Sequence, residues 1–442
     1  MTRALGLAAL WALVGCGSGR DSPGPTSVEA CRYVGQGTKE PEVQRPGAEC
    51  VSVATLNPLT GALGAVGFAL ENAARLAVED LNQTGLPGGK KLCLVACDSR
   101  TDPSTVEATL EGVISGFGVV AVNGAAESGS SIEAAKILGP LGIPQVSCCS
   151  TSPKLSEDPD VYRTVPSDAL QGVVLANVAA SLASPAKAVS IIYVNDAYGQ
   201  ALAKVFEEAF VRLGGTVPRS VPYAPGAPAY FGVVERALEG DPDNVLLVAF
   251  PADGAEVLRS WRLSGLAPSV GWLATDGLRD EKFVVASGAT SEGIVGTAPR
   301  LQGAHYTSFD GRYRRAFGGE APGIFTSNQY DAIMLIGLAM ARAGRFDPSA
   351  IRAAIPSVAS APGIIVSPDD VAGALRASTN EVDYSGASGE LEMDANGDVV
   401  TDYRVWRVAR GALADTADCW TCGTDTGTVS GSGVICSRVG CS

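Results

Sequence analysis

The sequence has almost none of the residue that most often carries enzyme chemistry. His305 is the only histidine among 442 residues, and it lies in the loop-like segment "LQGAHYTSFD". A Ser-His-Asp or Cys-His catalytic site would have to use this one residue, and histidine-rich metal sites are excluded. HExxH and GxSxG motifs are also absent. These absences argue against hydrolytic chemistry and against a histidine-based metal centre.

Positive charge and long apolar runs are scarce as well. Lys and Arg number 33 against 47 Asp and Glu, which gives a formal net charge of −14 and a pI near 4.7. Nucleic-acid binding needs clustered Lys and Arg and is therefore excluded. After the N-terminal segment, no apolar stretch approaches the roughly 20 residues that cross a bilayer. We expect the body of the protein to be soluble.

The N-terminal segment predicts export. Residues 1 to 15 combine Arg3 with a short apolar run, as in a signal peptide. The ending "LVGC" resembles a bacterial lipobox, which is cut before a cysteine that carries lipid. We therefore expect Cys16 to anchor the protein in the bacterial cell envelope; the alternative is an ordinary signal peptide. Residues 16 to 48, rich in turn formers and charges, are predicted to be a flexible tether.

Ten cysteines remain after Cys16, and export favours disulfide bonds among them. Cys31 and Cys50 bracket a Pro- and Gly-rich segment and could close it as a loop. Cys93 and Cys97 lie about 13 Å apart if both are on one strand, and a disulfide needs Cα atoms within about 7 Å, so their partners must come from elsewhere. The tail at residues 411 to 442 holds four more, for which disulfides are favoured over zinc binding: Cys419, Cys422, Cys436 and Cys441.

The segment "SCCSTSP" at residues 147 to 153 contains two adjacent cysteines. Cys148 and Cys149 could bond to each other, or one could reach a distant cysteine. A thiol redox centre at this pair is the one enzymatic alternative. The segment "DANGD" looks like the start of a calcium loop, but Val399 and Val405 replace the required glycine and glutamate. We therefore expect no metal and no cofactor.

From residue 49 onward, short apolar segments alternate with amphipathic ones. The strand candidates are residues 50–56, 91–97, 119–124 and 144–149, and the alternation restarts at 188–196, 244–250, 270–276 and 292–298. This alternation predicts α/β architecture with parallel sheets covered on both faces. Two successive units predict two lobes. A late helix, "SNQYDAIMLIGLAMARAG", and an expected hairpin over residues 389–408 with its turn at Asn396-Gly397 indicate that the chain returns to both lobes.

Small polar residues follow the predicted strands. Ser128 follows the third strand and opens a helix, while Ser150 and Thr151 follow the fourth. Ligands of open α/β sheets bind at the carboxyl ends of strands, where helix N-termini offer N–H groups to anions. In the second unit, Tyr198 and Asp276 follow strands and would suit an ammonium group. The pattern therefore predicts a zwitterion site; the alternative is that these residues only cap helices.

Several longer segments carry a family resemblance. They are "LNPLTGALGAVGFALENAARLAVEDLNQTG", "SCCSTSPKLSEDPDVYRTVPSDALQG", "IIYVNDAYGQALAKVFEEAFVRLGG", "WLATDGLRD" and "NQYDAIMLIGLAMARAG". Together, over about residues 50 to 410, they resemble the leucine/isoleucine/valine-binding type of periplasmic solute-binding protein, the type I family that feeds ABC importers. The resemblance implies two doubly wound α/β lobes joined by three crossings. Lobe 1 would comprise 49–167 and 299–392, and lobe 2 would comprise 168–298 and 393–410; the tail lies outside the resemblance.

The resemblance also assigns ligand-binding roles one residue at a time. It implies that the hydroxyl of Ser128 and the amide and hydroxyl of Thr151, aided by Ser150, bind the ligand carboxylate and backbone. It gives Cys149 a carbonyl that accepts from the ligand ammonium. Asp168 falls at the first crossing, and the second lobe supplies Tyr198, Phe250 and Asp276. Val66 departs from the family, whose branched-chain binders have a pocket tyrosine there.

We therefore expect an exported, lipid-anchored solute-binding protein for an amino acid or a similar small carboxylated molecule. Its lobes would close over the ligand, and an ABC permease would be its partner. A tethered ligand-sensing domain of the same fold is the alternative binding function.

Overall fold

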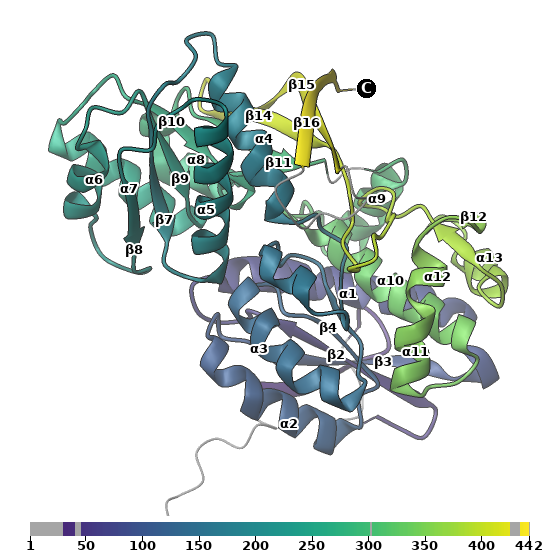
Figure 1. Ribbon diagram of the computed structural model, residues 1–442. Helices are drawn as coiled ribbons and strands as arrows, with labels where there is room; N and C mark the ends of the chain where they lie inside the picture. The colour runs from purple at the N-terminus through teal and green to yellow at the C-terminus, as the bar shows by residue number, and fades with distance from the viewer. Residues whose placement is uncertain (1–29, 40–45, 301–302, 425–433, 442) are drawn as a thin grey trace, which may run out of the picture.

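The computed structural model describes residues 30–39, 46–300, 303–424 and 434–441, which form two α/β lobes (Figure 1). The predicted signal peptide and Cys16 lie outside the described residues. Three connections join the lobes: β6 to α4, β11 to α9, and β13 to β14. The expected α/β fold with two lobes and three crossings is confirmed.

The sheet of lobe 1 has the strand order β1-β3-β2-β4-β5-β6. Its strands run parallel except β1, which is antiparallel to β3. The strands are β1 (Cys31–Gly35), β2 (Cys50–Asn57), β3 (Lys91–Asp98), β4 (Ala121–Gly124), β5 (Gln145–Ser147) and β6 (Val161–Arg163). The helices between them are α1 (Gly64–Thr84), α2 (Val106–Phe117) and α3 (Ser128–Leu138).

A second stretch of chain completes lobe 1. The long helix α10 (Thr326–Ala343) is buried along nearly its whole length and packs against α1. Around it lie α9 (Tyr306–Ala316), α11 (Pro348–Ala354), α12 (Pro356–Ala359), α13 (Val371–Ala377) and the small sheet of β12 (Ile364–Val366) and β13 (Val382–Tyr384). Burial on all sides explains why the apolar residues of α10 are not confined to one stripe.

Lobe 2 is built on a sheet of strand order β16-β15-β14-β11-β10-β9-β7-β8. The strands are β7 (Val189–Val194), β8 (Ser220–Tyr223), β9 (Asn244–Val248), β10 (Gly271–Ala274), β11 (Val295–Pro299), β14 (Tyr403–Ala409), β15 (Ala412–Thr424) and β16 (Val434–Gly440). The helices are α4 (Asp168–Ala180), α5 (Ala197–Arg212), α6 (Phe231–Leu238), α7 (Pro251–Ser264) and α8 (Glu281–Ser287). Each of the eight predicted strand segments coincides with a strand of one of the two large sheets.

The predicted tether is wrong in its middle part. Cys31–Gly35 form β1, and disulfides Cys31–Cys97 and Cys50–Cys93 fasten this region to lobe 1. The loop closure expected between Cys31 and Cys50 is therefore wrong as well. The conclusion that Cys93 and Cys97 need distant partners is confirmed. These pairings were not visible in the local sequence because the bonded residues are 66 and 43 positions apart.

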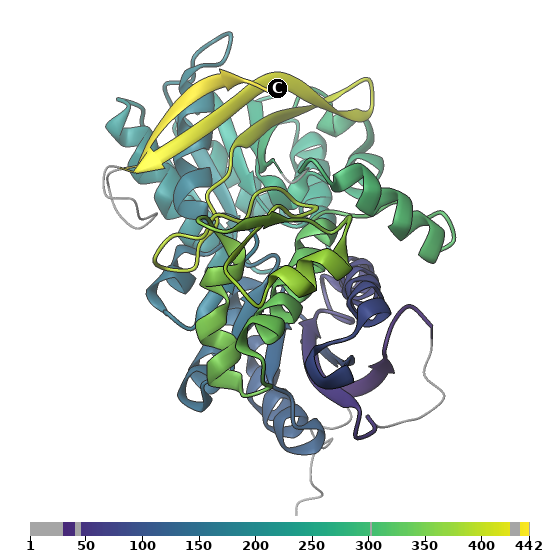
Figure 2. The same cartoon turned by 90° about the vertical axis from the view of Figure 1, so that its right-hand side faces the viewer.

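The expected hairpin over residues 389–408 forms only in part. The turn is present, with the Asp394 side chain accepting from the N–H groups of Asn396 and Asp398, but a single bridge joins Met393 to Val399. The second arm instead enters β14, which pairs with β15. The β15–β16 hairpin, in the tail outside the family resemblance, extends the sheet of lobe 2 (Figure 2). The four tail cysteines form the disulfides Cys419–Cys441 and Cys422–Cys436, and not the alternative zinc site.

Among the described residues, no helix combines the length and the apolar character that a membrane crossing requires.

Candidate ligand-binding site

The "SCCSTSP" segment forms a buried loop after β5. Cys148 and Cys149 are bonded to each other, so neither carries a free thiol. Cys148 is fully buried and Cys149 is half-buried. All ten cysteines that the structure describes are paired, in five disulfides. No described cysteine is therefore left with a free thiol.

Serine hydroxyls fix the path of this loop. The Ser147 Oγ lies 2.7 Å and the Ser150 Oγ 3.0 Å from the carbonyl oxygen of Ala125. Ser147 Oγ also accepts from the N–H of Ser150 at 3.2 Å, and Ser150 Oγ is 2.7 Å from the hydroxyl of Ser131. The hydroxyl of Ser150 is thus engaged with the fold, and the Ser150 side chain serves to shape the loop.

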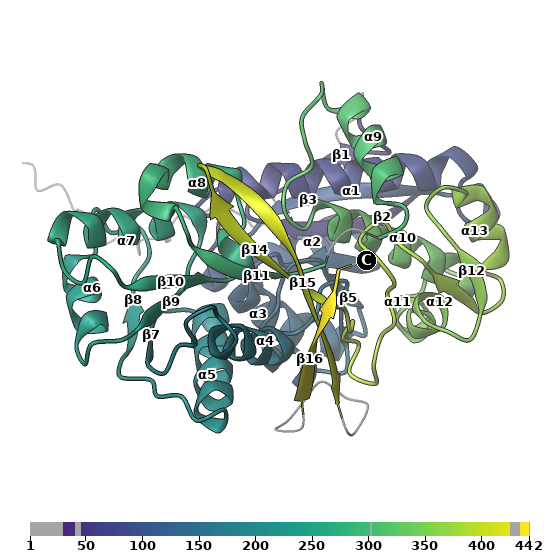
Figure 3. The ribbon, with the colours of Figure 1, turned by 90° about the horizontal axis from the view of Figure 1, so that it is seen from above.

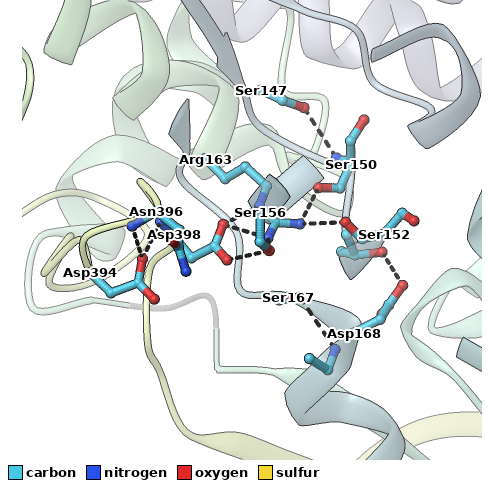
Figure 4. Close-up of polar contacts among 12 residues, drawn as sticks. Ser147, Ser150, Ser152, Ser156, Arg163, Ser167, Asp168, Asp394, Asn396 and Asp398 are labelled. Atoms are coloured by element: carbon cyan, nitrogen blue, oxygen red, sulfur yellow. Dashed lines mark hydrogen bonds and ion pairs between the residues drawn. The ribbon is translucent and has the colours of Figure 1, made fainter. Parts of the chain in front are cut away.

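Arg163 supports the same loop, a role that was not predicted from the sequence. Its guanidinium donates to the carbonyl oxygens of Ser150 and Ser152, at 3.4 and 3.0 Å, and to the Ser156 hydroxyl at 2.7 Å (Figure 4). It also forms an ion pair with Asp398, whose Oδ1 lies 2.7 Å from Nε. Both side chains are buried. Because Asp398 belongs to the third crossing, this ion pair joins the loop to the hinge.

Two hydrogen bonds join Thr151 and Asp168. The Thr151 hydroxyl donates to Asp168 Oδ2 at 2.7 Å, and the N–H of Asp168 donates to the Thr151 carbonyl at 2.8 Å. Ser167 caps α4 by accepting from the N–H of Ala169, which places Asp168 in the first helical turn. Asp168 is fully buried, and its Oδ1 has no hydrogen-bond partner in the described part of the chain. An orphaned buried carboxylate oxygen is free to accept from a ligand.

Lobe 2 contributes a second buried carboxyl group, that of Asp276. Asp276 follows β10, and its Oδ1 accepts from the Tyr198 hydroxyl at 3.0 Å. The Tyr198 ring stacks on Phe250 with 5.6 Å between ring centroids. Gly277, next in the chain, is needed here because a Cβ at that position would lie 2.7 Å from the Ala249 carbonyl oxygen. These contacts fix the direction of the Asp276 side chain.

Asp168 and Asp276 perturb each other. Burial raises the pKa of Asp168 well above its usual value and the negative charge of Asp276 raises it further, while hydrogen bonding from Thr151 opposes both effects. Burial also raises the pKa of Asp276, against hydrogen bonds from Tyr198 and Gln171. The site therefore holds two carboxyl groups that resist simultaneous ionisation, and it favours a ligand that brings positive charge.

The remaining predicted residue, Ser128, lies beside the same loop. It opens α3, and its Oγ accepts from the N–H of Ser152 at 3.3 Å. Its neighbour Glu127 was not predicted; it is buried, one of its carboxylate oxygens has no partner among the described residues, and burial raises its pKa. The helix that Ser128 opens, α3, contacts α5 of lobe 2, the helix that carries Tyr198.

A cavity of about 810 Å³ lies between the lobes next to the second crossing. Lobe 1 contributes Val66, Phe68 and Phe325, and lobe 2 contributes Arg279 and Arg404. Val66, which stands where the branched-chain binders of the family have a pocket tyrosine, thus lines this cavity.

The single histidine of the sequence lies away from these residues. His305 Nδ1 is 2.6 Å from Asp369 Oδ2, outside the ligand region. The described residues contain no group of three or more His, Cys, Asp or Glu suited to hold a metal ion.

Sequence comparison finds known proteins that are similar to this chain. A sequence model of the periplasmic binding protein family matches residues 51–412. A chemotactic signal transduction system substrate-binding protein, BasB of Halobacterium salinarum, is 28% identical over 380 residues, covering 80% of this chain and 86% of its own. A Leu/Ile/Val-binding protein homologue of Brucella melitensis is 25% identical over 68% of this chain and 81% of its own.

Solved structures share the fold. A leucine-binding protein of Thermotoga maritima superposes with a TM-score of 0.72 at 24% identity, covering 83% of this chain and 98% of its own. A branched-chain amino acid transporter substrate-binding protein of Streptococcus pneumoniae, in complex with isoleucine, has a TM-score of 0.69 at 20% identity and covers 83% and 99%. At these identities the likeness establishes the fold alone.

Proposed function

Because this chain belongs to the periplasmic binding protein family, we propose that it captures an amino acid or a similar small carboxylated solute between its lobes. The protein is a solute-binding receptor and not an enzyme. One observation carries the choice of ligand: Asp168 and Asp276 are both buried, the charge of Asp276 acts on Asp168, and one oxygen of Asp168 has no hydrogen-bond partner among the described residues. An ammonium group satisfies both carboxylates at once.

The ligand would contact both lobes. Its ammonium lies between Asp168 and Asp276 and reaches the carbonyl of Cys149, with the Tyr198 ring alongside. Its carboxylate accepts from the Ser128 hydroxyl and from the Thr151 amide. Only the closed arrangement offers all of these contacts, so binding shifts the hinge equilibrium toward closure.

Delivery to an ABC permease at the membrane completes the proposed role. Cys16 would carry the lipid anchor and lies outside the described residues. The chain between Cys16 and β1 is the part that remains for a tether, since β1 is fastened to lobe 1 by Cys31–Cys97. The lipid would thus hold lobe 1 close to the membrane and leave lobe 2 to move.

A second candidate role is a tethered sensor that reports ligand to a partner protein. It is supported by the similarity to a substrate-binding protein of a chemotactic signal transduction system. Permease genes beside the gene for this chain favour import, and signalling genes in their place favour the sensor.

A thermal-shift screen of the mature domain against amino acids and short uncharged amides tests the proposed ligand class. A ligand at 100 times its Kd adds about 2.7 kcal/mol to the free energy of unfolding. We expect at least one amino acid to raise Tm. The zwitterion proposal fails if no amino acid shifts the transition.

A further inference from the structure

The C-terminal hairpin lies beyond the family match, which ends at residue 412. Disulfides Cys419–Cys441 and Cys422–Cys436 tie its second strand to its first. The first strand, β15, pairs with β14 and so joins the sheet of lobe 2 (Figure 3). This chain has therefore added a covalently closed element to the edge of the lobe 2 sheet.

One face of the hairpin packs on the helix that carries Asp168. Trp420 and Cys422 are buried in a cluster with Leu170 and Val174 of α4. Tyr403 of β14 belongs to the same cluster, and its hydroxyl donates to the carbonyl of Ser167 at 3.1 Å. Leu170 is two positions from Asp168, so the packing supports the first turn of α4.

A side chain of the hairpin also reaches the turn that carries Asp276. The carboxylate oxygens of Asp415 lie 2.9 and 3.2 Å from Nη2 of Arg279, and Arg404 donates to the same carboxylate at 2.6 Å. The N–H of Arg279 in turn donates to the Asp276 carbonyl at 2.9 Å. Burial acts to raise the pKa of Asp415, but the two guanidinium groups outweigh it and lower that pKa. Asp415 is thus ionised, and its carboxylate holds this turn through Arg279.

We infer that the disulfide-closed hairpin braces the ligand site, and that Asp415 is a positioning residue that acts on Asp276 through Arg279. The same element supports Asp168 through Trp420. This inference rests on the proposed function, in which the two carboxyl groups share the ligand ammonium. The distance between the two carboxyl groups determines how strongly their negative charges repel each other. By fixing that distance, the hairpin determines how readily both groups are ionised.

Three substitutions in the hairpin isolate this role. Asp415→Asn removes the anchor, and Asp415→Glu retains its charge. Asp418→Asn is the matched control, because Asp418 lies on the same strand but pairs with Arg438 of β16. Arg279→Gln cuts only the link to the Asp276 turn and leaves the ion pair between Asp415 and Arg404 intact.

The first measurement needs no ligand. Aspartate carboxyl ¹³C resonances of the unliganded protein report the apparent pKa values of the Asp168–Asp276 pair. We expect Asp415→Asn and Arg279→Gln to change these values, and Asp415→Glu and Asp418→Asn to leave them near the wild type. Unchanged values in both Asp415→Asn and Arg279→Gln overturn the brace. If Asp415→Asn does not fold, Arg279→Gln alone decides.

The second measurement is calorimetric titration with L-leucine as the probe. We expect Asp415→Asn to weaken binding by roughly tenfold, the size of coupling expected between neighbouring groups, with Asp418→Asn unaffected. Equal affinities in these two variants contradict the brace. If the wild type binds neither leucine nor any other amino acid, the proposed function fails while the carboxyl titration still decides the brace.

Discussion

At the scale of single residues, the proposed ligand region contains two buried acids, Asp168 and Asp276, and no ion pair is shown for either among the described residues. Arg163, which donates to the loop, forms its ion pair with Asp398. Asp168 and Asp276 therefore keep raised pKa values in the unliganded protein. A ligand ammonium would lower both pKa values, because it stabilises the ionised form of both carboxyl groups.

This linkage predicts proton release on binding. A site that holds a proton when empty loses it when the ammonium arrives, so amino-acid affinity rises with pH above the usual carboxyl range and levels off once both acids are ionised without ligand. Calorimetric titrations in buffers of different ionisation enthalpy measure the released protons. Zero proton release at every pH between 4 and 8 would contradict the shared-proton description of the pair.

Asp331 gives a separate prediction about stability. It is buried at the start of α10, its carboxylate accepts from the N–H groups of Ala387 and Ser388, and burial raises its pKa to about 6. The folded state therefore binds a proton more tightly than the unfolded state, whose pKa is about 3.9. The stabilising contribution of Asp331 is fully present below pH about 4 and is lost as pH rises to about 6. This loss lowers the free energy of unfolding by roughly 3 kcal/mol.

Urea unfolding between pH 4 and 7 checks this effect. We expect Asp331→Asn to flatten the decline in the free energy of unfolding over that range. Asp370→Asn, which alters an exposed cap of α13, serves as the control and should keep the wild-type slope. A wild-type slope in Asp331→Asn contradicts the assignment.

At the scale of elements, the Arg163–Asp398 ion pair joins β6 to the third crossing. Removing one partner leaves the other charge buried and unpaired, which costs about 3–5 kcal/mol. We expect Asp398→Asn to lower the free energy of unfolding by about that amount. Glu239→Gln, which breaks the exposed pair with Arg219, should cost less than about 1 kcal/mol. Equal losses in the two variants, measured by urea unfolding, would show that the buried pair is not a structural link.

The elements that could be predicted from sequence are those with a local signal. The strands that end before Ser150 and Asp276 are apolar runs bounded by turn formers, and they were predicted. β1 was missed because "CRYVG" sits in a polar segment and is held by strand pairing and a disulfide to β3. The role of Arg163 was missed for a similar reason, since its partner Asp398 is 235 positions away.

Candidate site residues could be chosen from the sequence, but the contacts between them could not be predicted. Polar residues at strand ends, together with the family resemblance, pointed to Thr151, Asp168 and Asp276. The reciprocal bonds between Thr151 and Asp168 depend on the crossing that brings α4 beside the loop, and no short segment encodes that approach. The engagement of the Ser150 hydroxyl with Ser131 depends on packing between α3 and the loop.

At the scale of the whole molecule, the proposed ligand region takes residues from both lobes. Thr151 belongs to lobe 1, Tyr198 and Asp276 belong to lobe 2, and Asp168 follows the first crossing. A ligand that touches both lobes favours the closed hinge over the open one. We expect small-angle scattering to give a smaller radius of gyration for the amino-acid-saturated protein than for the unliganded protein; identical values would rule out closure on binding.

The most direct test of the proposed function is calorimetric titration of wild type, Asp276→Asn and Asp253→Asn with the same amino acid. Asp253 is the matched control, because it is also a buried acid of lobe 2 but accepts from Gly226 and Tyr230. Loss of one partner of a buried charge pair costs about 2–5 kcal/mol, or roughly 30-fold to several-thousand-fold in Kd. We predict that loss for Asp276→Asn and wild-type affinity for Asp253→Asn. Wild-type affinity in Asp276→Asn would contradict an ammonium site between the lobes.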